Sequence, residues 1–68
     1  MTIGIIPNIS KNEILIIVKK IIEQIHQNGF NYILSESLLI FKGELNGESK
    51  FLSLDELSKS CDMVVSIG

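Results

Sequence analysis

The sequence predicts an α/β fold: a three-stranded parallel, Rossmann-like β-α-β-α-β segment that is a truncated part of a larger domain. Three short apolar stretches rich in β-branched residues occupy residues 3–7, 31–35 and 63–67. Between them lie two segments that carry the helix-start pattern Ser-x-x-Glu. Strands that alternate with helices build parallel sheets, because each helix returns the chain to the edge where the next strand begins.

The first predicted strand, residues 3–7, is an apolar run that ends at Pro7 and Asn8. A continuous apolar run bounded by turn residues is typical of a strand that is covered on both faces. Pro7 has no N–H group to give to a ladder, so we expect the strand to stop there.

A helix is predicted over Lys11–Asn28. Ser10 and Glu13 form a capping box at its start, and Gly29 is expected to close it in the left-handed conformation. Ile16 falls among polar residues and should be exposed. The apolar face at helical spacing consists of Ile14, Val18, Ile21, Ile22 and Ile25.

Asn31–Ser35 is predicted to be the second strand. The segment 36–51 contains the apolar run Leu38–Phe41 and the hairpin signal Asn46-Gly47, so it is compatible with a small excursion or a hairpin.

The remaining residues predict a helix followed by a strand. Ser53 and Glu56 form a second capping box, which predicts a short helix that ends near Ser60. Met63–Ile67 is then predicted to be a third, buried strand in a central position of the sheet.

Composition excludes several functional classes. The formal charge is −2, and all six cationic side chains are Lys, so nothing favours attraction to nucleic acid or to an anionic membrane. The longest apolar run, Ile14–Val18, is far shorter than the roughly 20 residues of a spanning helix. No signal peptide is apparent, and the single Cys fits a reducing compartment. We therefore expect a cytoplasmic protein without nucleic-acid or membrane partners.

Few residues of the sequence suggest a catalytic or metal-binding role. The chain has no G-x-G-x-x-G, no P-loop and no C-x-x-C motif. His26 lies late in the first helix and is interpreted as structural. Cys61 has Asp62 beside it rather than a cation, so we expect an inert thiol. Asp55 and Glu56 are interpreted as helix-start residues and Asp62 as a strand entry. No catalytic residue and no metal ligand are predicted.

Two residues follow the carboxyl ends of predicted strands, where open α/β sheets bind ligands. Asn8 is either a turn residue or a contact to a nucleotide phosphate or ribose. Gly68 is either a turn glycine or the first residue of a glycine-rich phosphate loop. Asn8 and Gly68 are therefore the two candidate nucleotide-binding residues.

These pieces resemble the N-terminus of an NAD kinase, and the resemblance covers essentially the whole chain. In that family, a leucine-containing short helix, an Asp, an apolar strand and a Gly lead into a Gly-Gly-Asp-Gly-Thr motif, of which Gly68 would be the first glycine. Ile9 stands where the family usually has Pro. The matching segments are Ile3–Asn8 with Ser10-Lys11, the helix closing at Gly29, Leu52–Leu57 and Cys61–Gly68.

The resemblance implies a concrete activity for the parent protein. NAD kinases transfer the γ-phosphoryl group of ATP to the 2′-hydroxyl of the adenosine ribose of NAD, with a divalent metal such as Mg²⁺. The Asp of the glycine-rich motif is the base, so the 68-residue chain should be inactive alone. Residues 1–68 would be the N-terminal part of the nucleotide-binding domain. The C-terminal domain, through which these enzymes form homo-oligomers, would be absent.

Two alternatives stay open. A lipid kinase of the diacylglycerol type shares the first strand, an Asn-containing loop and the glycine-rich signal. A non-enzymatic, flavodoxin-like binding module is the other. A receiver of that order would carry acidic residues at the ends of its first and third strands, whereas these strands end in Ile6-Pro7 and Ile67-Gly68.

Overall fold

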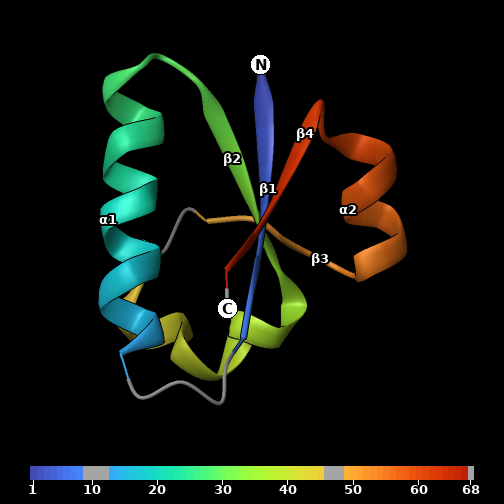
Figure 1. Ribbon diagram of the computed structural model, residues 1–68. Coiled ribbons are helices and arrows are strands. Elements are labelled where there is room, and N and C mark those ends of the chain that lie inside the picture. Colours follow the sequence, from blue (N-terminus) through green and yellow to red (C-terminus); the bar gives the residue numbers. More distant parts are fainter. Residues whose placement is uncertain (9–12, 46–48, 68) are drawn as a thin grey trace.

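The computed structural model describes residues 1–8, 13–45 and 49–67. The chain forms a parallel sheet with helices on both of its faces (Figure 1). Among the described residues, no helix is long and apolar enough to cross a membrane. The elements in chain order are β1 (Thr2–Pro7), α1 (Ile14–Gln27), β2 (Asn31–Ser35), the 3-10 helix η1 (Glu36–Glu44), β3 (Phe51–Leu52), α2 (Leu54–Ser60) and β4 (Met63–Ile67).

The sheet has the strand order β3-β2-β1-β4, and every pairing is parallel. The predicted parallel α/β class is confirmed. The predicted number of strands is wrong, because β3 adds a fourth strand beside Leu34 and Ser35 of β2. Two residues are too few to show any hydrophobic periodicity, so this strand forms only because β2 offers it a free edge.

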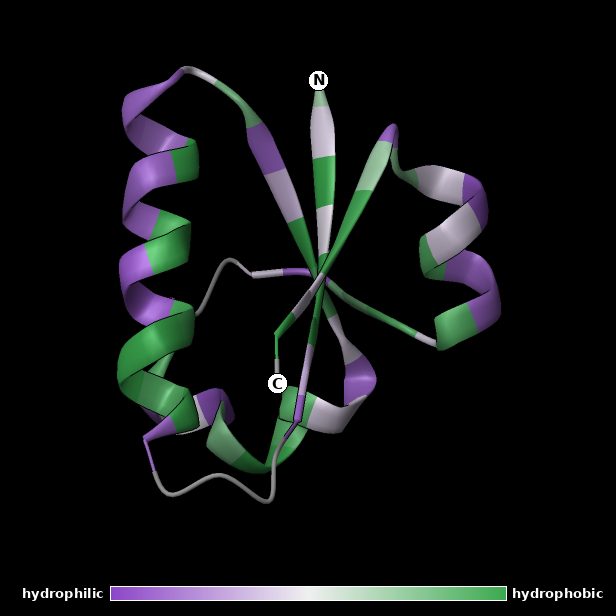
Figure 2. Ribbon diagram, in the orientation of Figure 1, coloured by the Kyte–Doolittle hydropathy of each residue, from purple (hydrophilic) through white to green (hydrophobic). Residues whose placement is uncertain are grey.

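Helix α1 covers one face of β1 and β2. Ile14 and Val18 are fully buried against Ile3 and Ile5 of β1, and the apolar stripe of α1 faces the sheet in Figure 2. The predicted apolar face is thus confirmed. Ile16 is 57% exposed, as expected from its place among polar residues.

The ends of α1 differ in how well they were predicted. Gly29 has a φ of 74° and its N–H donates to the carbonyl of His26, so the left-handed closing residue is confirmed. The described helix begins at Ile14 rather than Lys11, and Glu13 at its N-cap makes no side-chain capping bond. Ser10 and Lys11 lie outside the described residues, and so does the predicted capping box that depends on Ser10.

Helix α2 covers the opposite face. Its Leu57 is fully buried against Gly4 of β1. A Cβ added to Gly4 would point toward α2. Half of the predicted capping box is confirmed, since the Ser53 hydroxyl accepts the N–H of Glu56 at 3.4 Å. The Glu56 carboxylate accepts the Ser53 hydroxyl at 3.1 Å rather than the Ser53 backbone N–H. The helix ends at Ser60, as predicted.

The segment after β2 is not a hairpin. Glu36–Glu44 forms the 3-10 helix η1, which the Ser35 hydroxyl caps by accepting the Ser37 N–H. Leu38 is buried in the core and holds η1 against the sheet. The chain then returns to β2 in the parallel direction, which a tight hairpin cannot do. The hairpin signal Asn46-Gly47 lies outside the described residues.

The predicted position of the last strand, β4, is also wrong. It was expected to be buried and central, but it lies at the end of the described sheet, with Met63 50% and Val64 39% exposed. The reason is topological: after β3 the chain crosses back over the sheet through α2 and pairs with the other side of β1.

Candidate functional site

The candidate site is the carboxyl edge of the sheet between β1 and β4. Pro7 lies opposite Ile67, and the N–H of Asn8 donates to the carbonyl of Ile67 over 2.7 Å. From β1 the chain first builds β2 and β3 on one side and then β4 on the other, so strand order reverses between β1 and β4. In open α/β sheets a reversal of this kind leaves a crevice where ligands bind.

Of the two candidate nucleotide-binding residues, the structure describes one. Asn8 is exposed at this edge, directly after β1, and its carboxamide carries both donors and an acceptor. Gly68 lies outside the described residues. The last described residue before it, Ile67, is the one whose carbonyl accepts the Asn8 N–H.

The opposite edge of the same two strands is held by Asp62. Its carboxylate accepts the N–H of Thr2 at 2.8 Å, and its own N–H donates to the carbonyl of Thr2 at 2.9 Å. The interpretation of Asp62 as a strand-entry residue is therefore confirmed. This pair of bonds sets the register in which Ile67 reaches Asn8 at the far end.

Cys61 packs beneath α2 and has the environment of an inert thiol. Burial raises its pKa above the usual value, and the neighbouring carboxylate of Asp62 raises the pKa further. A raised pKa keeps the thiol protonated and therefore poorly nucleophilic.

The acidic residues in the described part of the chain do not assemble a metal site. Asp55 and Glu56 lie exposed in the first turn of α2, as interpreted from the sequence. Within residues 1–8, 13–45 and 49–67, no three His, Cys, Asp or Glu side chains are grouped so that they could hold an ion. The described residues therefore offer no ligand set for Mg²⁺.

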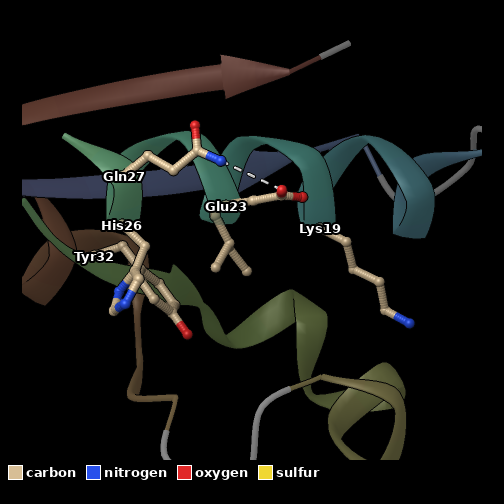
Figure 3. Close-up of a pocket in the computed structure, with 6 residues that line it drawn as sticks. Lys19, Glu23, His26, Gln27 and Tyr32 are labelled. Carbon is tan, nitrogen blue, oxygen red and sulfur yellow. Dashed lines mark hydrogen bonds between the residues drawn. The ribbon is translucent and has the colours of Figure 1, made fainter.

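Sequence reasoning missed a pocket on the flank of α1, shown in Figure 3. The pocket has a volume of about 440 Å³. His26, interpreted from the sequence as purely structural, is part of its wall. No periodic pattern marks it, because four of its lining residues are polar side chains of α1, one is an apolar side chain of the same helix and the sixth comes from β2. They are Lys19, Ile22, Glu23, His26, Gln27 and Tyr32.

The fold defines the class of protein, a parallel α/β fold in which the strand order reverses between β1 and β4. No protein-family model matches the chain, and no curated protein or solved structure matches it significantly.

Proposed function

We propose that this chain is the N-terminal segment of an ATP-dependent NAD kinase, which phosphorylates the 2′-hydroxyl of the adenosine ribose of NAD. The observation that carries the proposal is the bond between Asn8 and Ile67 at 2.7 Å. It joins the carboxyl ends of β1 and β4, the two strands that precede the segments which the family resemblance assigns to the nucleotide, although these strands lie far apart in the sequence. The support is geometric: the strand order reverses between these two strand ends.

The residues at this edge suit a role in binding. The carboxamide of Asn8 has the donors and the acceptor needed to contact a ribose hydroxyl or a phosphate oxygen. A glycine at position 68 permits close approach of the backbone to a polyphosphate, because it lacks a Cβ and tolerates positive φ. The base of the reaction would be the Asp that the family carries after this glycine. No step of the proposal depends on a metal held by the described residues.

The first test reads the coding sequence beyond codon 68. The expected continuation is Gly-Asp-Gly-Thr or a near variant, and the full-length product should convert NAD to NADP with ATP and Mg²⁺. A continuation without an Asp within a few residues overturns the proposal. Activity on diacylglycerol instead of NAD would establish the lipid-kinase alternative, and binding without any turnover would favour the flavodoxin-like module.

The second test asks whether Asn8 contacts the nucleotide. In the full-length protein, Asn8→Asp places a carboxylate beside the proposed phosphates and should raise the KM for ATP or NAD by electrostatic repulsion. Asn31→Asp is the matched control, because Asn31 is also exposed but begins β2 at the opposite edge of the sheet. An unchanged KM in Asn8→Asp, or an equal rise of the KM in both variants, would show that Asn8 does not contact the nucleotide.

A further inference from the structure

The pocket beside α1 is lined by that helix and by β2. β3 pairs with β2 only at Leu34 and Ser35, so on the edge of β2 that faces away from β1 no described strand pairs with Tyr32. A hollow of about 440 Å³ lies between the side of α1 and Tyr32. Small-molecule sites usually have volumes of about 300–1,000 Å³, so this hollow has a suitable size.

The walls of the pocket are chemically asymmetric. His26 and Tyr32 line it together and lie at the same end in Figure 3, whereas Lys19 extends at the other end. Ile22 is half-buried and contributes an apolar surface. Two aromatic rings and an aliphatic side chain form a surface on which a flat ring can stack.

The polar groups that line the pocket are not all equally available. The Tyr32 hydroxyl is bonded to the Ser49 hydroxyl at 2.8 Å, which fixes the ring. The Glu23 carboxylate accepts a 3.4 Å bond from the Gln27 amide, and Figure 3 shows this pair along the helix. Among the described residues, the Lys19 ammonium has no ion-pair partner. Glu23 keeps its negative charge in this bond, and Lys19 is the lining residue with a permanent positive charge, at the end away from the two rings. An anionic ligand group would therefore be met at Lys19.

We propose that this pocket binds a small aromatic carboxylate, with its ring against His26 and Tyr32 and its carboxylate at Lys19. The two ends of the pocket require the two parts of such a ligand at once: a neutral aromatic leaves Lys19 unpaired, and an aliphatic acid leaves the rings uncovered. This inference goes beyond the proposed kinase function and does not depend on it, because the pocket lies on the flank of α1 and not at the edge between β1 and β4.

The experiment titrates the ¹⁵N-labelled 68-residue chain with 3-phenylpropionate and follows the backbone amide resonances. We expect saturable shifts confined to 19–27 and Tyr32, with a dissociation constant on the order of 1 mM. The neutral 3-phenylpropionamide has nearly the same shape and should bind more weakly. Shifts that never saturate, or equal binding of the acid and the amide, overturn the proposal.

Two exposed lysines that are neighbours in α1 provide the matched variants. Lys19→Gln should weaken binding of the acid by about two- to fivefold, the usual effect of one exposed ion pair, and leave the amide unaffected. Lys20→Gln should change neither, because Lys20 does not line the pocket. An equal effect of both variants would mean that only net charge matters and would refute the proposed site. Tyr32→Leu removes the aromatic ring, so it should weaken binding of both the acid and the amide, and unchanged affinity in it would contradict stacking.

Discussion

Gly4 of β1 lies directly beneath Leu57 of α2, so closely that a Cβ added to Gly4 would stand 2.9 Å from the Leu57 Cγ and 3.0 Å from the Cys61 Sγ. Leu57 is fully buried at this point. The glycine is therefore required by packing between helix and strand, since only a residue without a side chain allows α2 to lie this close to the sheet.

We predict that Gly4→Ala destabilises the chain by about 1–3 kcal/mol, the usual cost of forcing an extra methyl group into a packed contact. The measurement is urea unfolding followed by circular dichroism. Gly43→Ala is the control, because a Cβ there meets nothing within 4 Å, and its effect should stay within about 0.5 kcal/mol. Leu57→Ala removes the clashing side chain, so Gly4→Ala should cost less in that background. Equal unfolding midpoints of wild type and Gly4→Ala would contradict this packing.

The orientation of α1 predicts that alanine substitution at two isoleucines, two positions apart, lowers the free energy of unfolding by very different amounts. Ile14 is 1% exposed in the core and Ile16 is 57% exposed. Ile14→Ala should cost about 2–5 kcal/mol through lost burial and a residual cavity, and Ile16→Ala much less. Denaturant titration of the two variants measures the difference. Similar losses at both positions would show that a different face of the helix meets the sheet.

The thiol of Cys61 should react slowly. Burial, and then the charge of Asp62, raise its pKa, so at pH 8 a thiol reagent should modify the folded chain more slowly than the chain unfolded in urea. Asp62→Asn keeps an acceptor for Thr2 but removes the charge, and should restore part of the rate. Because the folded pKa lies above the unfolded one, the thiol's contribution to stability is present at lower pH. That contribution is lost as the pH rises above the ordinary thiol pKa and through the raised pKa of the folded chain. A folded chain that reacts as fast as the unfolded one would disprove this environment.

Strand β4 predicts concentration-dependent self-association. Its residues carry no charge and no proline, the usual protections of an edge strand, and among the described residues it pairs with β1 alone. Val64→Lys should suppress the association in sedimentation velocity experiments. Leu54→Lys is the control: Leu54 is 58% exposed, yet it lies on α2 away from the edge. A chain that stays monomeric at every concentration, or two variants with equal effects, would count against pairing through β4.

Short-range patterns predicted much of the fold. The Ser53 cap on the Glu56 N–H, the left-handed Gly29 and the apolar face of α1 each depend on residues within a few positions of one another, and all three are confirmed. The same reasoning failed at 36–51, where apolar residues without a period form the 3-10 helix η1. There the buried Leu38, packed into the core, decides the local structure.

The candidate site was predictable only in part. That Asn8 follows a strand can be read from Pro7 and the apolar run before it, and one of the two causes that raise the pKa of Cys61 from its acidic neighbour. The pocket at His26 and Tyr32 could not be predicted, because side chains of α1 and of β2 form it jointly.

By itself, the sequence determined the class of fold and the faces of its helices, since hydrophobic periodicity and capping act within one element. The tertiary structure alone decided the order β3-β2-β1-β4, the exposed position of β4 and the meeting of Asn8 with Ile67. These depend on which side of β1 each returning strand occupies. Both edges of β1 offer the same backbone hydrogen bonds, so only packing of α1 and α2 on opposite faces selects between them.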